Sequence, residues 1–205
     1  MWRLRVDREG RVLGMNGFGS TFQGTSRRVA TVNLEAIAQS FAPRVGQGQM
    51  TAQLSPADSV RATVGNAHIA IDYSRPSRRG RQIFGGVVPW GQVWRTGANA
   101  ATSFTTDAPL DINGVTVPAG SYTLWSIPSP SGWKLIINKQ TRQWGTVYHA
   151  EQDLARIDMQ TAALPTPVEQ FQITVEPTSG QAGVLALQWD TTRAYVPFTV
   201  KPSSE

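Results

Sequence analysis

The 205-residue sequence contains no cysteine, and this absence excludes disulfide bonds, thiolate metal sites and cysteine nucleophiles. No apolar run approaches the roughly 18 residues of a membrane-spanning helix, so the sequence predicts no membrane span. Its N-terminus also lacks the charged and then apolar pattern of a signal peptide. Charged residues make up only 16% of the chain, which argues against long surface helices rich in Glu and Lys.

Lysine is also scarce, because the 19 basic residues are 16 Arg and three Lys. A net charge of +5 would suit a nucleic-acid partner, but such surfaces usually spread Lys and Arg along one face. Here five Arg lie between Tyr73 and Thr106 with no acidic residue among them. Arg clusters beside aromatic residues are more typical of bidentate contacts with particular carboxylates or phosphates. We therefore expect a small-molecule partner and no nucleic acid.

The sequence is rich in turn-forming residues, with 19 Gly and 13 Pro, and from Ser59 onward it alternates like a series of short strands. Strands are expected at 60–64, 67–73, 101–106, 110–112, 115–117, 121–127, 133–138, 170–176, 183–190 and 195–200. The dipeptide Asn113-Gly114 is the strongest hairpin signal. Residues 139–156 are expected to be irregular, with one helical turn near 151–154. This pattern predicts an all-β protein with very little helix, an antiparallel β-sandwich or alternatively a β-barrel.

The first fifty residues have few core-forming side chains and are expected to form a separate segment, 1–52, before a β-sandwich module at 53–202. Its expected elements are strands at 2–6, 12–13 and 27–32, a short helix after residue 33, and a linker at 45–52. Asn33 can cap the helix N-terminus, and Pro43 is expected to end it. The segment is interpreted either as the tail of a truncated upstream domain or as a strand addition to the main module.

The run from Asp72 to Asn99 is the most unusual part of the sequence. Its five guanidinium groups repel one another unless negative groups lie among them, and its aromatic residues can stack on guanidinium planes. Two interpretations stay open. The run either lines a ligand pocket, or it is a structural loop held over one end of the sandwich by hydrogen bonds from Arg to the backbone.

Within this run the chain resembles a bacterial family known as domain of unknown function 2911. The matching segments are Asp72-Tyr-Ser-Arg-Pro, Gly80, Ile83-Phe-Gly-Gly, Val93-Trp-Arg-Thr-Gly-Ala-Asn99, Pro118-Ala-Gly-Ser-Tyr-Thr-Leu124, Ile137-Asn-Lys139 and Gln143-Trp-Gly145. The resemblance covers most of residues 60–200 and leaves out the first fifty. It implies a β-rich domain from proteins that are commonly exported, hence periplasmic or secreted in the full-length parent, and it implies no activity.

Signals of catalysis are weak. The sequence has no Gly-x-Ser-x-Gly motif and only two histidines, of which His149 in a loop is the candidate general base. His68 and Asp72 would lie about 13 Å apart along one strand, at roughly 3.3 Å per residue, which is too far for shared metal coordination. No pair of carboxylates stands out as a glycosidase pair. We therefore expect no metal and no cofactor.

The loops 73–99 and 138–149 are together expected to form a polar and aromatic pocket at one end of the sandwich. Its predicted ligand-binding residues are Tyr73, Arg75, Arg79, Arg95, Asn99, Gln143, Trp144 and Tyr148. The leading hypothesis is binding of a small anionic or carbohydrate ligand. The alternatives are a hydrolase acting on ester, phosphoester or glycoside bonds, with the Arg cluster stabilising negative charge, and a structural accessory domain of a longer exported protein.

Overall fold

The computed structural model describes residues 2–17, 25–46 and 54–202, which fall into two compact units, Met1–Leu54 and Ser55–Glu205. The strands account for 58% of the chain and the helices for 6%. The prediction of an all-β protein with little helix is therefore confirmed. No helix in these three described stretches is long and apolar enough to cross a membrane.

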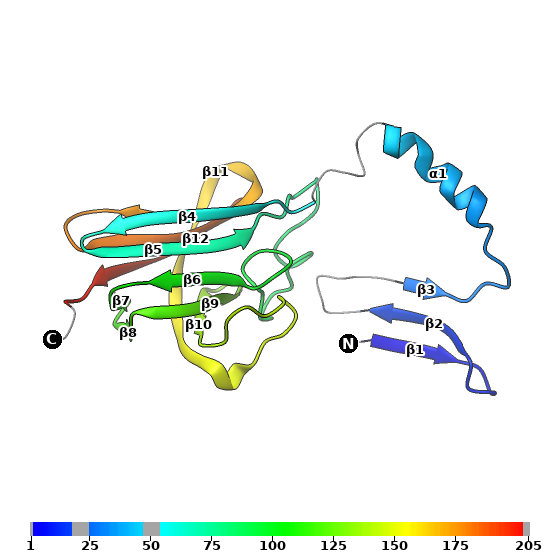
Figure 1. Cartoon of the computed structure of the whole chain (residues 1–205), viewed down its shortest axis with the longest axis horizontal. Helices are drawn as coiled ribbons and strands as arrows, with labels where there is room; N and C mark the ends of the chain where they lie inside the picture. Colours follow the sequence, from blue (N-terminus) through cyan, green and yellow to red (C-terminus); the bar gives the residue numbers. More distant parts are fainter. Residues whose placement is uncertain (1, 18–24, 47–53, 203–205) are drawn as a thin grey trace. The chain divides into compact units, whose positions relative to one another are not determined.

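The second unit is built on one nine-stranded antiparallel sheet (Figure 1). Its strands are β4 (Ala57–Val64), β5 (Ala67–Ser74), β6 (Thr102–Thr106), β7 (Leu110–Ile112), β8 (Val115–Val117), β9 (Gly120–Ile127), β10 (Trp133–Asn138), β11 (Asp153–Pro177) and β12 (Ala182–Val200). The order across the sheet is β4-β5-β6-β9-β10-β11-β12-β7-β8. The sheet folds over into a β-sandwich, and its described strands do not close into a barrel. A short 3-10 helix, η1 (Ala150–Gln152), precedes β11.

The hairpins lie where the turn residues predict them. β7 and β8 form a hairpin whose innermost pair is Ile112↔Val115. Asn113 and Gly114 make the two-residue turn, with φ of 50° and 85°. A two-residue hairpin turn of this type requires positive φ at both central positions, and Asn-Gly meets that requirement. In β5 the side chains of Ile69, Ile71 and Tyr73 are buried, as their alternation predicts.

The strands β11 and β12 form a long hairpin that changes partners along its length. β11 pairs with β10 from Asp153 to Met159 and with β12 from Gln160 to Pro177. Its pairing with β12 is interrupted between Ala163 and Val168, where the sequence contains two prolines that cannot donate a ladder hydrogen bond. The expectation that residues 153–156 are irregular, with no strand before 170, is therefore wrong. β11 is stabilised along its length by pairing with β10 and then with β12, and no local sequence pattern indicates this pairing.

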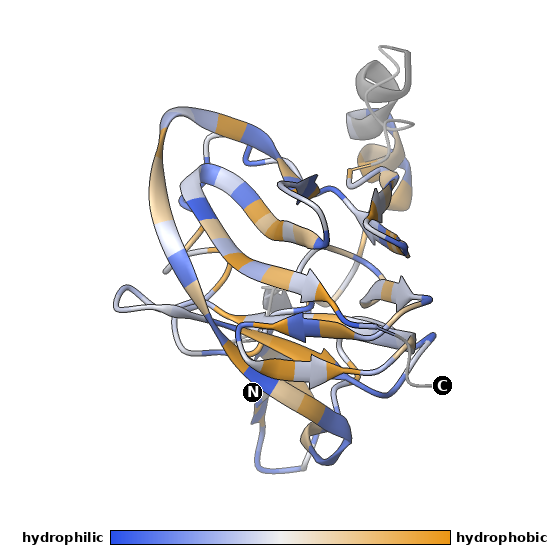
Figure 2. Ribbon diagram, turned by 90° about the vertical axis from the view of Figure 1, so that its left-hand side faces the viewer, coloured by the Kyte–Doolittle hydropathy of each residue, from blue (hydrophilic) through white to orange (hydrophobic). Residues whose placement is uncertain are grey.

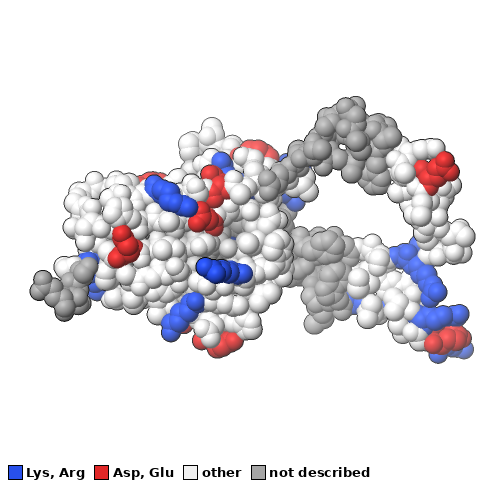
Figure 3. Space-filling view, in the orientation of Figure 1, with Lys and Arg blue, Asp and Glu red and all other residues white. Residues whose placement is uncertain are grey.

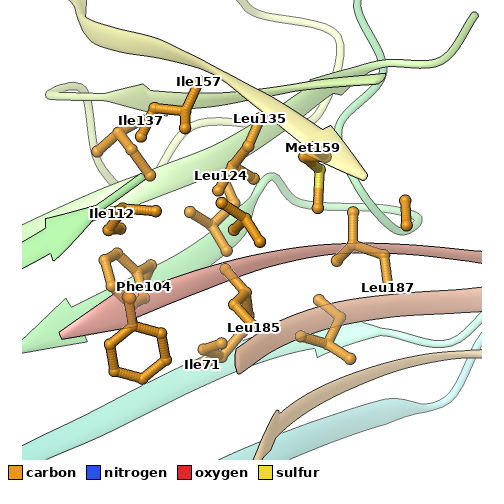
Figure 4. Close-up of a cluster of buried hydrophobic side chains, with 14 of the residues drawn as sticks. Ile71, Phe104, Ile112, Leu124, Leu135, Ile137, Ile157, Met159, Leu185 and Leu187 are labelled. Atoms are coloured by element: carbon orange, nitrogen blue, oxygen red, sulfur yellow. The ribbon is translucent and has the colours of Figure 1, made fainter. Parts of the chain in front are cut away.

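The core lies between the two layers of the sandwich (Figure 4). Side chains from β5, β6, β9 and β10 face those of β12, and hydrophobic and hydrophilic residues alternate along these strands (Figure 2). Buried core residues in this close-up include Ile71, Phe104, Ile112, Leu124, Leu135, Ile137, Ile157, Met159, Leu185 and Leu187. Burial of these side chains supplies the main driving force for the fold.

The connection between β5 and β6 forms no strand, but it delivers large side chains to the core. Phe84 and Trp94 are buried, and the indole of Trp94 stacks on that of Trp189 at 5.9 Å between centroids and an interplanar angle of 18°. Phe171 meets Trp94 edge-on at 5.0 Å. This aromatic cluster anchors the connection to one part of the sandwich, so that much of the Arg-rich run belongs to the core structure.

The first unit consists of a three-stranded sheet and one helix. Its elements are β1 (Trp2–Val6), β2 (Val12–Gly17), β3 (Thr25–Arg27) and α1 (Leu34–Gly46). None of its side chains for which burial is described is buried. Asn33 caps the helix as predicted, since its Oδ1 accepts a 2.9 Å hydrogen bond from the Ala36 N–H.

Two expectations for this unit are wrong. The third strand lies at Thr25–Arg27 and not at 27–32. It pairs with β2 from Gly14↔Arg27 to Asn16↔Thr25, and one further hydrogen bond joins the Arg28 N–H to the Leu13 carbonyl. The helix continues past Pro43 to Gly46, since a proline removes one helical hydrogen bond without necessarily ending the helix. The linker expected at 45–52 lies outside the described residues, apart from its first two positions in α1.

Candidate functional site

Most arginines of the 73–99 run are held by structural contacts. The Arg75 Nε donates to the carbonyl of Phe171 at 3.1 Å, and its guanidinium pairs with Asp58 at 3.2 Å. The guanidinium of Arg78 pairs with Asp190 at 3.3 Å. Arg81 donates to the carbonyls of Ser77 and Arg78 at 2.6 and 3.0 Å. The negative partners come from β4 and β12, far from these arginines in the sequence.

Arg79 differs from its neighbours. Its side chain is exposed and contacts no ionic or hydrogen-bonding partner in the described part of the chain, while its backbone N–H donates to Glu169 at 2.8 Å. Arg75 and Arg79 therefore lie toward β11, and neither lines the groove described below.

The segment Trp94–Asn99 links the core to the outer surface. Thr96 has φ of 51°, an unfavourable value for a β-branched residue, and is completely buried. Hydrogen bonds hold it there: its carbonyl accepts from the Thr102 hydroxyl at 2.7 Å and its own hydroxyl donates to Ser126 at 3.0 Å. The next left-handed residue, Asn99, has φ of 60°. Strain of this kind persists only where the surrounding structure over-determines it.

Arg95 and Asn99 join this segment to the loop that follows β10. The Arg95 guanidinium donates to the Asn99 carbonyl at 3.2 Å, and the Gly145 N–H donates to the same oxygen at 3.0 Å. Burial lowers the pKa of the half-buried Arg95. The Asn99 amide donates to the Ser74 hydroxyl at 3.3 Å. The two predicted loops therefore meet, as the sequence analysis expected, and are joined by hydrogen bonds.

The loop 139–145 is organised around the buried hydroxyl of Thr123. This hydroxyl donates to the Gln140 carbonyl at 3.0 Å and accepts from the Gln143 Nε2 and the Trp125 indole, both at 3.0 Å. Because its only hydrogen is used, it can only accept from Gln143, which fixes the orientation of that amide. The Gln143 Oε1 is buried and accepts no hydrogen bond from the described residues.

An open groove of about 650 Å³ lies beside this loop, on the outer face of β5, β6 and β9. Its lining residues are Asp72, Tyr73, Ser74, Ala100, Ala101, Ser103, Thr105, Ser121, Thr141, Arg142 and Gln143. Hydroxyls dominate the sheet part of this lining because alternate residues of a strand point outward. The hydroxyls of Thr105 and Ser121, opposite one another on β6 and β9, lie 3.4 Å apart.

The groove holds one acid and one base with different surroundings. Asp72 is paired with Arg61 at 2.6 Å. Arg142 is exposed, has φ of 64°, and makes no ion pair or hydrogen bond with the described residues. Charges of both signs are interspersed on the face of the module seen in Figure 3. Sequence reasoning missed Arg142, because nothing in its local pattern distinguishes it from other polar loop residues.

Tyr148 lies outside the groove, in a small second core with Trp125, Ile136 and Ala101. Its hydroxyl donates to Asp153 at 2.6 Å and accepts from Arg156 at 3.1 Å. Burial, and then the hydrogen bond to Asp153, raise the pKa of Tyr148 to about 12. Among the other predicted residues, Gln143 lines the groove, Asn99 contacts its edge through Ser74, and Trp144 is 56% exposed beside it. Tyr73 is also at the groove, but its side chain is buried in the core and its hydroxyl accepts from the Ile173 N–H at 3.1 Å.

The geometry around the histidines provides no catalytic triad. The His149 ring lies 2.8 Å from Glu151 and is solvent-exposed, and the His68 ring lies 2.7 Å from Asp107. Hydrogen bonds from His68 lower the pKa of Asp107. In the described residues neither ring makes a hydrogen bond to a serine or threonine hydroxyl, and no three metal-ligating side chains come together.

The comparisons with known proteins identify a family but no activity. No curated protein and no solved structure matches the chain. One family model, described as a protein of unknown function (DUF2911), matches residues 55–198, which include both loops and the whole groove. The chain therefore belongs to the DUF2911 family, as its Arg-rich run and the Trp-Arg-Thr-Gly-Ala-Asn segment led us to expect.

Proposed function

We propose that the module binds a small polyhydroxylated anion, such as a sugar acid or a sugar phosphate, in the groove beside Arg142. The observation that carries the proposal is the position of this arginine at the groove, with no acidic partner in the described structure. A guanidinium fork of this kind binds carboxylates and phosphates in bidentate geometry. The exposed Arg79 provides a contrast, because it lies outside the groove.

The backbone at Arg142 supports this proposal. A left-handed conformation is unfavourable by about 1–2 kcal/mol for a residue with a Cβ, and glycine would relieve it. The neighbouring hydrogen bonds of Gln140 and Gln143 to Thr123 hold the loop in this shape. The strained arginine thus presents its charge at a rigid loop, which lowers the entropic cost of capturing an anion.

The remaining lining residues favour a ligand with several hydroxyls. Ser103, Thr105 and Ser121 offer groups that donate and accept hydrogen bonds, on neighbouring strands about 4.8 Å apart. The buried Gln143 Oε1 has no donor among the residues that the structure describes, which is unfavourable by about 1–3 kcal/mol. A small shift of this amide toward a ligand hydroxyl would satisfy it. A polyol carrying one anionic group matches all of these features.

We also propose that the protein works outside the cytoplasm, in the periplasm or secreted. This part rests on the family resemblance, since its members are commonly exported. Detection of the full-length protein in periplasmic and extracellular fractions of its host tests it. Retention in the cytoplasmic fraction contradicts it.

Isothermal titration calorimetry with galacturonate, gluconate and glucose 6-phosphate, each matched with galactose or sorbitol, tests the ligand class. We expect saturable binding of at least one anion and little binding of its neutral counterpart. Arg142→Gln should lower the affinity for the anion about 10- to 100-fold, because a charge-assisted hydrogen bond contributes about 1.5–3 kcal/mol. Arg79→Gln is the matched control and should leave binding unchanged. No binding of any anion, or equal loss in both variants, would exclude the proposal.

A hydrolase remains the alternative function, with His149 as base. Chromogenic ester, phosphoester and glycoside substrates test it on the unmodified protein and on His149→Ala. Turnover that disappears in the variant would favour the hydrolase. Turnover that persists would remove His149 from the mechanism, and absence of turnover would leave binding or a structural role.

A further inference from the structure

A second groove, of about 290 Å³, lies around Trp90. Its lining comes from the β5–β6 connection, the β9–β10 turn and the two long strands: Trp90, Ser129, Pro130, Trp133, Thr161, Ala162, Ala163, Thr191 and Thr192. It shares no lining residue with the groove beside Arg142. The two grooves are therefore separate sites on the module.

The Trp90 indole forms a fixed platform in this groove. Its ring lies 5.9 Å from that of Phe84, tilted by 31°, and 39% of the residue is exposed. Gly85, with φ of 80°, lies directly against the indole, where a Cβ would overlap the ring nitrogen. The residue after Trp90 is also anchored, since the Gly91 N–H donates to the Pro128 carbonyl at 2.8 Å. The exposed ring is thus held in place before any ligand arrives.

The polar groups around this platform are uncharged and largely unused. Threonines at 161, 191 and 192 line the groove, and their hydroxyls make no side-chain hydrogen bond with the described residues. The Trp90 indole N–H also has no partner in that part of the chain. None of the described residues that line the groove is charged. An anion has no counter-charge here, whereas a neutral ligand with hydroxyls finds both donors and acceptors.

We infer that the Trp90 groove is a binding site for a neutral sugar ring. The apolar C–H face of a pyranose would lie on the indole, and its hydroxyls would bind the threonine side chains and the indole N–H. The volume is at the lower end of the range for ligand sites, which suits a single ring. The site is independent of the proposed anion site, because it is built from other residues and binds a neutral ligand instead of an anion.

NMR titration of the full chain with methyl β-D-glucopyranoside and methyl β-D-galactopyranoside tests this inference. The seven tryptophans give separate indole N–H signals, and Trp90→Phe assigns the one that it removes. We expect this signal to shift saturably with at least one glycoside, with a Kd of about 1 mM for so small a ligand. Sorbitol, which has the hydroxyls but no rigid apolar face, should not shift it.

Three variants separate stacking from general structural effects. Binding to the variants is followed through the indole N–H signal of Trp133, which also lines the groove and is present in each of them. Trp90→Ala should weaken binding at least tenfold, and Thr161→Val, which keeps the side-chain shape, about three- to tenfold. Trp144→Ala removes a second exposed indole and should leave binding unchanged, as should Arg142→Gln. Trp90→Phe keeps an aromatic ring in the groove, so it is the control for a loss of binding that comes from disturbed folding. The inference is overturned by a Trp90 signal that neither glycoside shifts, or by unchanged affinity in Trp90→Ala.

Discussion

Replacement of Gly145 by alanine tests whether the two loops are locked together as the structure shows. Gly145 is not among the residues with positive φ, so its backbone is accessible to alanine. On that ground alone the change should stabilise the protein by about 0.4–1 kcal/mol. The added Cβ, however, would lie 2.5 Å from the Asn99 carbonyl oxygen and would overlap the Cδ of Arg95. The sign of the effect therefore depends on tertiary packing.

The expected loss of stability follows from the contacts that the added Cβ would disrupt. The Asn99 oxygen accepts hydrogen bonds from Gly145 and Arg95, and each contributes about 0.5–1.5 kcal/mol. Overpacking adds about 1–3 kcal/mol. After the backbone gain, a net loss of about 2–4 kcal/mol is expected. For a protein of this size this lowers the Tm by about 10 °C.

Urea and thermal unfolding, followed by tryptophan fluorescence, measure this loss. Arg95→Ala in the Gly145→Ala background removes the overlapping Cδ, so the double variant should be less destabilised than the sum of the single changes by at least about 0.5 kcal/mol. The Asn99 carbonyl stays in the way, so the rescue is partial. A Gly145→Ala protein as stable as the parent, or strictly additive effects, would refute this packing.

Three further results are expected. Arg75→Met should lower the free energy of unfolding in urea by about 1–2 kcal/mol, because it removes the contacts of Arg75 with β11 and β4. Arg79→Met should change it by less than about 0.5 kcal/mol. Equal effects of the two substitutions would contradict the structural role of Arg75. Arg142→Gly should change the free energy of unfolding by less than about 1 kcal/mol, because glycine removes the strain of the left-handed backbone but makes the unfolded chain more flexible. A large loss of stability would mean that the Arg142 side chain holds the loop. The pKa of Tyr148 is about 12 in the folded protein, so tyrosinate absorbance should show a late-titrating group that is missing in Tyr148→Phe. Because that pKa lies above the ordinary value near 10, stability should fall between about pH 10 and 12, and less steeply in Tyr148→Phe; identical profiles would contradict the assignment.

Local patterns predicted much of the sandwich. The alternation in β5 identified its buried face, and Asn113-Gly114 marked the β7–β8 turn. These features depend on side-chain period and turn chemistry, which neighbouring residues determine. The path of β11 was missed because its beginning, Asp153–Met159, is stabilised by β10 and the rest by β12. Pro165 and Pro167 also interrupt the strand pattern within the part that pairs with β12.

The candidate site shows the same division. Sequence correctly indicated that the Arg-rich run and the loop after β10 meet. That they are joined by a hydrogen bond from the Gly145 N–H to the Asn99 carbonyl became known only from the structure. It could not indicate that Arg75 meets Asp58, since their pairing depends on the register of β4 with β5. Nor could it select Arg142, whose importance comes from the loop conformation and from outward-facing hydroxyls on two other strands.

By itself, the sequence determined the fold class, most of the hairpins and the family of this protein, because each depends on short-range patterns or on a shared run of residues. Tertiary structure alone decided which arginines are neutralised, where the long strands bend, and that grooves form beside Arg142 and Trp90. The physical reason is that charge pairing and concave surfaces arise between residues distant in the chain, whose meeting is set by strand order and register.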